Sequence, residues 1–140
     1  MRVINKMKIL IIDGQGGKIG RMLVERLREK IPDAVITAVG TNSLATSNMI
    51  KGGVDNAATG ENPVIVGCRS ADIIVGPVGI VIADALFGEI TPAMACAVGQ
   101  SRARKILIPI NKCNNYVVGT GDFPVNDLIS KAVEEIIKNC

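Results

Sequence analysis

A glycine-rich segment near the start of the chain has the composition and spacing of a phosphate-binding turn. It consists of Gly14, Gln15, Gly16, Gly17, Lys18, Ile19 and Gly20. In such turns a glycine lets a phosphate approach the backbone, and the free N–H groups at the start of the following helix bind the phosphate charge. The spacing is GxGxxxG, because Ile19 stands where the third glycine of the strict GxGxxG pattern would be. We expect this segment to bind the phosphate of a small ligand.

Asp13 precedes the turn and puts a carboxylate beside the expected anion site. It would repel a phosphate unless it turns away, pairs with Lys18 or binds a metal. The last alternative leads to a different function, an enzyme that acts on a small phosphorylated or carboxylated metabolite with Asp13 and a divalent metal. Turnover that needs metal and fails in Asp13→Asn would support that function, and intact activity in the variant would contradict it.

Small and neutral polar residues also follow the other expected strands. They are Thr41, Asn42 and Ser43; Gly76, Pro77, Val78 and Gly79; and Asn111 and Lys112. Because the carboxyl ends of parallel strands meet at one edge of a sheet, where open α/β sheets bind ligands, we expect these residues to line one site. The first group would contact a ribose or base, the second would form the opposite wall, and the third would border the reacting end.

NAD(P) is the first ligand to consider for this site, although one of its usual protein partners is missing. In NAD-binding folds an Asp or Glu after the second strand holds the ribose 2′-hydroxyl, and a nearby Arg accommodates the 2′-phosphate of NADP. Thr41, Asn42 and Ser43 supply neither. The leading prediction is therefore a nucleotide- or dinucleotide-binding protein, for which we assign no catalytic residue. An alternative is a non-catalytic sensor or regulatory subunit that uses the same site and binds a protein partner.

The elements that must position these residues follow from apolar runs that alternate with helical periodicity. Strands are expected at 8–12, 34–39, 54–58, 72–76 and 106–110, with a short sixth strand at 116–118. Helices are expected from 17 or 18 to Pro32, from 42 or 43 to 50, from a cap at Asn62, from 91 to about 102, and from 124 to 138. This alternation predicts a single Rossmann-like domain over 1–140, a three-layer α/β/α fold with a mainly parallel sheet of five to six strands.

Several further residues lie in settings where chemistry is conceivable but an ordinary role is more common. The apolar segment Ile80–Phe87 is expected to be a buried helical turn or a contact between subunits of a homo-oligomer. Asp84 and Glu89 are interpreted as a helix cap or exposed carboxylates. Lys112 and Cys113 could act as base and nucleophile, but a thiol at a strand end is more often inert.

The composition excludes several classes of site. The 140 residues include no histidine, and the four cysteines show no CxxC spacing, so zinc sites lack their usual ligands and Ser-His or Cys-His catalysis is excluded within one chain. A net charge of +3 with 2% aromatic residues does not indicate nucleic-acid binding. The apolar stretches are too short or too interrupted for a membrane span or a signal peptide, so we expect a cytoplasmic protein with reduced thiols.

Six short segments together resemble a family of short bacterial proteins known only as a domain of unknown function. They are 11–17, 40–43, 58–62, 74–80, 88–94 and 109–114. The resemblance covers nearly the whole chain in a specific order. It implies a free-standing domain, and it implies no activity.

Overall fold

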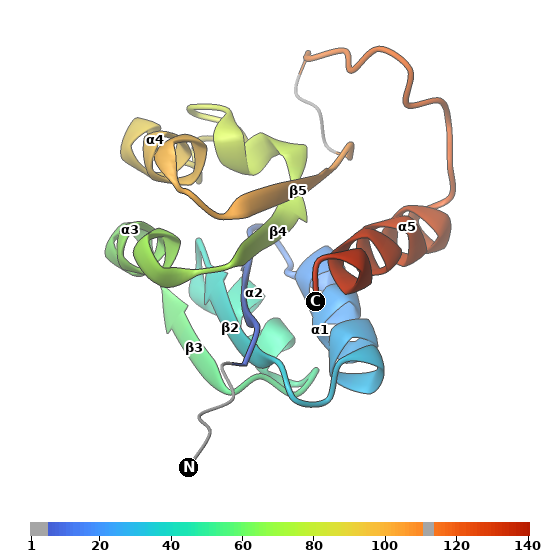
Figure 1. Ribbon diagram of the computed structural model, residues 1–140. Coiled ribbons are helices and arrows are strands. Elements are labelled where there is room, and N and C mark those ends of the chain that lie inside the picture. Colours follow the sequence, from blue (N-terminus) through green and yellow to red (C-terminus); the bar gives the residue numbers. More distant parts are fainter. Residues whose placement is uncertain (1–5, 111–113) are drawn as a thin grey trace.

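The computed structural model describes residues 6–110 and 114–140, in which strands and helices alternate (Figure 1). The strands are β1 (Lys8–Asp13), β2 (Val35–Gly40), β3 (Asn56–Thr59), β4 (Ile73–Pro77) and β5 (Arg104–Ile108). The helices are α1 (Lys18–Lys30), α2 (Ser43–Ile50), α3 (Glu61–Ser70), α4 (Pro92–Gln100) and α5 (Val125–Lys138), with a short 3₁₀ helix, η1 (Val78–Val81). Among these residues no helix combines the length and the apolar character that crossing a membrane requires.

The five strands of the described residues form one parallel sheet in the order β3-β2-β1-β4-β5. The order reverses at β1, which pairs with β2 on one side and with β4 on the other. In open α/β sheets ligands bind outside the carboxyl ends of the strands at such a switch point. The predicted Rossmann-like fold is confirmed, and the turn after β1 lies at its switch point.

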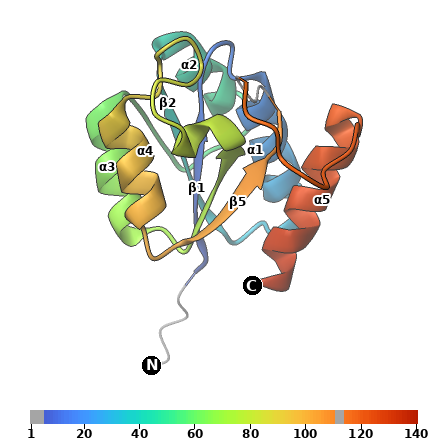
Figure 2. The same cartoon turned by 90° about the horizontal axis from the view of Figure 1, so that it is seen from above.

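Helices cover both faces of the sheet, as Figure 2 shows for α1 and α5 on one side and α3 and α4 on the other. The side chains of β1 alternate between two cores, because successive residues of a strand point to opposite faces. Ile9 and Ile11 join Leu27 of α1 and Ile129 of α5 in the first core. Residues of β1 with the opposite orientation pack against α3 and α4 in the second core. A strand that is apolar on both faces therefore holds the start of the glycine-rich turn in a rigid position.

Two boundaries differ from the sequence prediction. The fifth strand begins at Arg104 and ends at Ile108, two residues earlier than predicted, because Arg104 pairs with Ile73 of β4. The first residues of this edge strand are charged, so the sequence alone does not indicate that they pair with β4. Charged residues are common in edge strands. The fourth helix ends at Gln100 rather than near Arg102, so its last turn is not basic.

The third helix begins earlier than its predicted cap. Gly60, with φ 108°, precedes the helix, and Asn62 lies within its first turn instead of capping it. This φ is strained for any residue that has a side chain, but glycine adopts it easily. Gly60 can therefore end β3 and allow α3 to start directly after it.

Two segments near the carboxyl edge also differ from prediction. Residues 116–118 form no strand; the segment 114–124 arches away from the body between β5 and α5 (Figure 1). Ile80 and Leu86 are buried as expected, but Phe87 at the end of the same apolar segment is 99% exposed. The backbone explains this outward direction, because Leu86, Phe87 and Gly88 all have positive φ and reverse the chain.

Candidate functional site

The glycine-rich segment forms a tight turn between β1 and α1. The N–H of Gly17 donates to the carbonyl of Gly14 at 2.9 Å, which closes the turn. Gln15 at its tip has φ 50°, and Gly17, which precedes α1, has φ 72°. Gln15, Gly16 and Lys18 are exposed, whereas Gly14, Gly17 and Gly20 are buried. The tip of the turn is therefore the part that a ligand can reach.

The three buried glycines are required by packing within the protein. A Cβ on Gly17 would lie 2.6 Å from the carbonyl oxygen of Ala45, and a Cβ on Gly14 would lie 2.7 Å from Thr41 Oγ1. A Cβ on Gly20 would collide with the sulfur of Met49 in α2. These glycines let α1 and α2 approach β1 closely, as predicted for Gly20, and they need no ligand to explain them.

Gly16 has no such explanation. Its φ is not positive, and a Cβ placed on it would meet no atom within 4 Å. Neither backbone conformation nor packing in the described residues therefore demands a glycine here. A bare backbone at the tip of the turn is what close approach by a phosphate requires.

Asp13 turns inward, away from the exposed tip. Its Oδ1 accepts the N–H of Gly14 at 2.8 Å, and its Oδ2 accepts the N–H of Gly20 at 2.7 Å. Burial raises the pKa of Asp13 from 3.8 to about 6, with the charge of Glu89 adding to the rise and the two backbone hydrogen bonds opposing it. Of the three alternatives for Asp13, the structure shows the carboxylate turned away and bonded to the backbone.

Glu89 is the main residue that the sequence interpretation missed. Its Oε1 accepts the N–H of Gln15 at 2.9 Å, the hydroxyl of Thr41 at 2.6 Å and the side-chain amide of Asn42 at 2.7 Å. Burial raises the pKa of Glu89, but these hydrogen bonds outweigh it and lower the pKa below its ordinary value. The interpretation of Glu89 as a helix cap or a merely exposed carboxylate was wrong. Its place in a loop after β4, at the carboxyl edge, was the available signal.

Asn42 ties the second strand end to the turn. Its Oδ1 caps α2 by accepting the N–H of Ala45 at 2.8 Å, and its amide nitrogen donates to the carbonyl of Gln15 at 3.0 Å. Asn48 of α2 donates in the same way to the carbonyl of Gly16 at 3.0 Å. The predicted residues 14–20 and 41–42 are thus brought together, and Ser43 is exposed beside them at the start of α2.

The predicted wall after β4 is mostly covered by the protein. Gly76, Pro77 and Gly79 are buried, and a Cβ on Gly79 would lie 3.2 Å from Ala85 of the following loop. Val78 is half-buried. The loop 82–90 therefore replaces this segment as the surface opposite the turn. Asn111, Lys112 and Cys113 lie outside the described residues.

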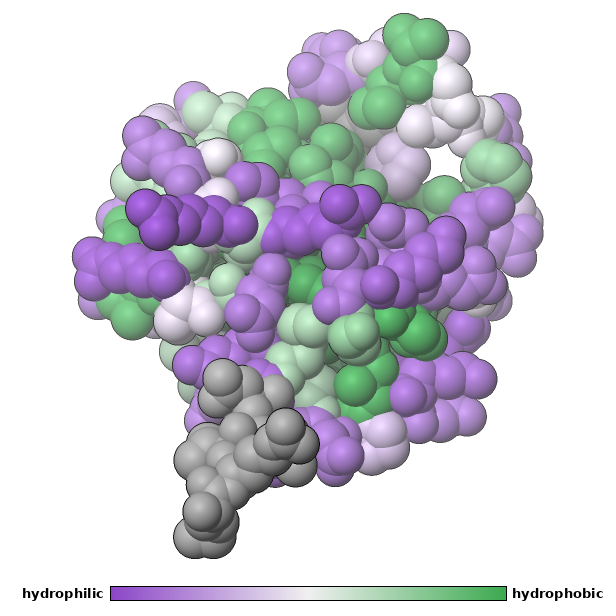
Figure 3. Space-filling view, viewed as in Figure 1, coloured by the Kyte–Doolittle hydropathy of each residue, from purple (hydrophilic) through white to green (hydrophobic). Residues whose placement is uncertain are grey.

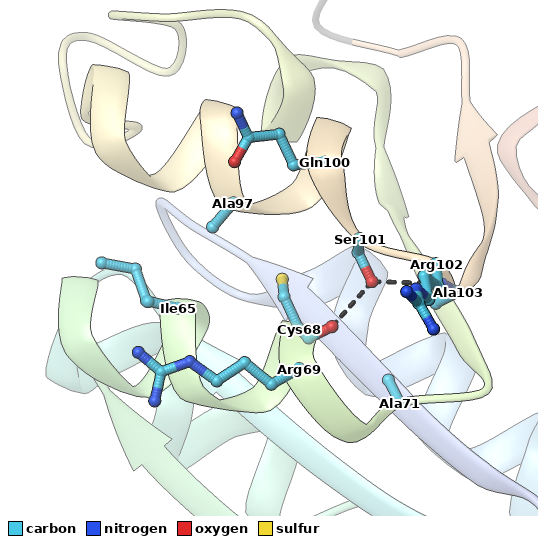
Figure 4. Close-up of a pocket in the computed structure, with 9 residues that line it drawn as sticks. All are labelled: Ile65, Cys68, Arg69, Ala71, Ala97, Gln100, Ser101, Arg102 and Ala103. Atoms are coloured by element: carbon cyan, nitrogen blue, oxygen red, sulfur yellow. Dashed lines mark hydrogen bonds between the residues drawn. The ribbon is translucent and has the colours of Figure 1, made fainter.

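A separate hollow of about 360 Å³ lies at the amino edge of the sheet, opposite the turn, between the C-terminal ends of α3 and α4 (Figure 4). Cys68 lies in it, and the carbonyl of Cys68 accepts the hydroxyl of Ser101 at 2.7 Å. Burial raises the pKa of the Cys68 thiol to about 11, which keeps it in the unreactive thiol form. Within residues 6–110 and 114–140 no three Cys, Asp or Glu side chains gather in a metal-binding group.

A known protein family matches most of the chain. The family described as Domain of unknown function (DUF3842) matches residues 8–140. The chain belongs to this family. This confirms the resemblance to a domain of unknown function seen in the sequence. No curated protein matches the chain.

Solved structures with the same general fold are distant. The chain is similar to a dodecameric FMN-dependent UbiX-like decarboxylase from Escherichia coli O157:H7, with 14% identity, a TM-score of 0.46 and coverage of 95% of this chain and 93% of that one. It is also similar to a universal stress protein from Archaeoglobus fulgidus, with 15% identity, a TM-score of 0.41 and coverage of 74% and 98%.

Proposed function

We propose that the protein binds a nucleotide-like ligand whose phosphate rests on the outer face of the turn at Gly16, with NAD(P) the first ligand to test. The observation that carries this proposal is the bare backbone at Gly16, a glycine that neither packing nor φ explains. It lies at the switch point of the sheet, where folds of this type bind their ligands.

Hydrogen-bond donors and charge for the phosphate come from the start of α1. The first N–H groups of a helix have no partner within it. Asp13 takes the N–H of Gly20, and no residue in the described part of the chain accepts those of Lys18 and Ile19, so they can bind an anion. The exposed Lys18 side chain adds a positive charge, and the helix dipole favours an anion at the same place. Asp13 points into the protein, and its two carboxylate oxygens accept the N–H groups of Gly14 and Gly20, so it leaves the exposed tip of the turn open.

The rest of the ligand would extend from the turn toward β2. Thr41, Asn42 and Ser43 stand at the end of that strand and would meet the ribose or base. The loop 82–90 would form the facing surface in place of Gly76, Pro77 and Gly79, with Val78 at its base. If the ligand is a dinucleotide, its far end would extend along the carboxyl edge of the sheet toward the end of β5.

A thermal-shift screen against NAD, NADP, their reduced forms, FAD, FMN, ATP, GTP and sugar phosphates tests the proposal. A ligand at about a hundredfold over its dissociation constant adds roughly 2.7 kcal/mol to the free energy of unfolding, a shift of several degrees for a domain of this size. We expect at least one nucleotide to produce such a shift. No shift from any of them would contradict nucleotide binding.

A second candidate function is a ligand sensor that reports to another protein chain. All three aromatic residues are at the surface: Phe87 is 99% exposed, Tyr116 is 82% exposed and Phe123 is 47% exposed. Aromatic side chains are enriched in protein interfaces, because they bury a large area with few rotatable bonds. Phe87 belongs to the same loop as Glu89, so contact with a partner there would be coupled to the turn.

A further inference from the structure

We propose that Glu89 is the acid that recognises the ribose hydroxyls of the ligand and selects a free 2′-hydroxyl over a 2′-phosphate. This inference rests on the proposed function and names the ligand class, a ribonucleotide without a 2′-phosphate. The carboxylate comes from the loop after β4 rather than from the end of β2, where an Asp or Glu usually serves this purpose.

The geometry places the Glu89 carboxylate at the end of β2 although the residue is far away in the sequence. It accepts hydrogen bonds from Thr41 and Asn42, the first two residues after β2. It also lies over the start of the turn, since a Cβ on Gly14 would be 3.1 Å from Glu89 Oε1. A ribose bound next to a phosphate on Gly16 would extend over this position.

One carboxylate oxygen is held by the protein and the other is left for a ligand. All three hydrogen bonds to Glu89 end on Oε1, and none from the described part of the chain reaches Oε2. The side chain is half-buried, so solvent or a ligand can contact it. The hydrogen bonds that lower the pKa of Glu89 keep it ionised at neutral pH, and an ionised carboxylate can only accept hydrogen bonds.

These features predict a specific preference. The 2′- and 3′-hydroxyls of a ribose can donate hydrogen bonds to Oε2. The 2′-phosphate of NADP would instead place two negative charges next to the carboxylate. The protein would therefore bind NAD better than NADP, and ADP better than 2′-deoxy-ADP. A ligand that lacks one hydrogen bond to a charged group is expected to bind roughly tenfold or more weakly than a ligand that makes it.

The test measures dissociation constants of NAD, NADP, ADP and 2′-deoxy-ADP by titration calorimetry for the wild type, Glu89→Gln and Asp84→Asn. Glu89→Gln keeps the size of the side chain and an oxygen acceptor for the Thr41 and Asn42 donors. Asp84→Asn removes a carboxylate from the same loop at an exposed position, and asparagine tolerates its φ of 66°. Thermal melts of both variants establish that they are folded.

We expect the wild type and Asp84→Asn to bind NAD and ADP about tenfold more tightly than NADP and 2′-deoxy-ADP. In Glu89→Gln we expect both preferences to fall by about tenfold. Nucleotide binding with the same preferences in Glu89→Gln would overturn the role of Glu89 and leave the proposed function standing. Failure of all four nucleotides to bind the wild type would overturn the proposed function itself.

Discussion

Asp13 combines burial with two backbone hydrogen bonds, and this combination gives it an unusual titration. Its pKa is raised to about 6 by burial, and the neighbouring Glu89 charge adds to the rise. We expect the Asp13 carboxyl to titrate near pH 6 in an NMR experiment that follows its carboxyl carbon. In Glu89→Gln the midpoint should move lower, because a negative neighbour is lost. A midpoint near 4 in the wild type would contradict this account of the turn.

The same shift gives a dependence of stability on pH. The folded state holds the Asp13 proton more tightly than the unfolded state, whose pKa is near 3.8. The contribution of Asp13 to the free energy of unfolding is therefore greatest below about pH 4 and falls as the pH rises to about 6, by on the order of 3 kcal/mol. Asp55 and Glu89, whose pKa values are lowered, act in the opposite direction at lower pH. Urea denaturation of wild type and Asp13→Asn between pH 4.5 and 7 checks this, since the fall should be absent in the variant.

Gln15 has a backbone conformation that costs energy for any residue with a side chain. Its φ is 50°, and both of its hydrogen bonds are made by the backbone, with Glu89 and Asn42 as partners. Gln15→Gly should stabilise the protein by about 0.5–1 kcal/mol, because relief of a left-handed conformation outweighs the added freedom of the unfolded chain. Gln15→Ala keeps the conformational cost and should bring no gain. Chemical denaturation measures both; a loss of stability in Gln15→Gly would show that the turn is not strained.

At the scale of elements, the start of α2 holds the turn in place. Asn42 caps α2 and also donates to the Gln15 carbonyl and to Glu89, whereas Thr91 caps α4 without contacting the turn. Asn42→Ala should cost about 2 kcal/mol or more in the free energy of unfolding, and Thr91→Ala about 1 kcal/mol. Nucleotide affinity should fall only in Asn42→Ala. Equal effects of the two variants on stability and affinity would contradict the role given to α2.

Most of the strands and helices, and the turn, could be predicted because each depends on a local pattern, whereas the predicted strand at 116–118 is absent. The run Lys8–Asp13 is buried from Ile9 onward, and the glycines after it indicate a tight turn before a helix. The register of β5 could not be predicted, since Arg104 and Lys105 resemble a loop until they pair with β4. Glu89 was missed for a similar reason: its partner Gln15 is 74 residues away, and only the folded chain brings them together.

At the scale of the whole molecule, several apolar side chains near the carboxyl edge are exposed. Phe87 and Val118 are among the most exposed, and Figure 3 shows the segment 114–124 standing apart from the body. A hollow of about 320 Å³ beneath this segment is lined by Ile106, Ile108 and Phe123, beside β5, which is the last strand of the sheet among the described residues. If the chain forms the homo-oligomer expected from its sequence, these exposed apolar side chains are where copies would associate.

Analytical ultracentrifugation tests this expectation. We expect the wild type to sediment as an oligomer, and Phe87→Asn to raise the dissociation constant by about tenfold or more, since burial of a phenylalanine contributes roughly 1.5–3 kcal/mol. Asparagine tolerates the positive φ of Phe87, so the loop should keep its shape. A matched change at Leu44, which is exposed on α2, should have no effect. A monomeric wild type would contradict self-association.

The most direct test of ligand binding at the turn compares Gly16→Val with Gly99→Val. Both glycines lack positive φ and have no atom within 4 Å of an added Cβ, but Gly99 lies in α4, away from the turn. With the nucleotide that gives the largest thermal shift, we predict that both variants melt as folded proteins and that only Gly16→Val loses binding, because its side chain fills the space of the phosphate. Equal affinity in Gly16→Val and the wild type would contradict a phosphate site at this turn.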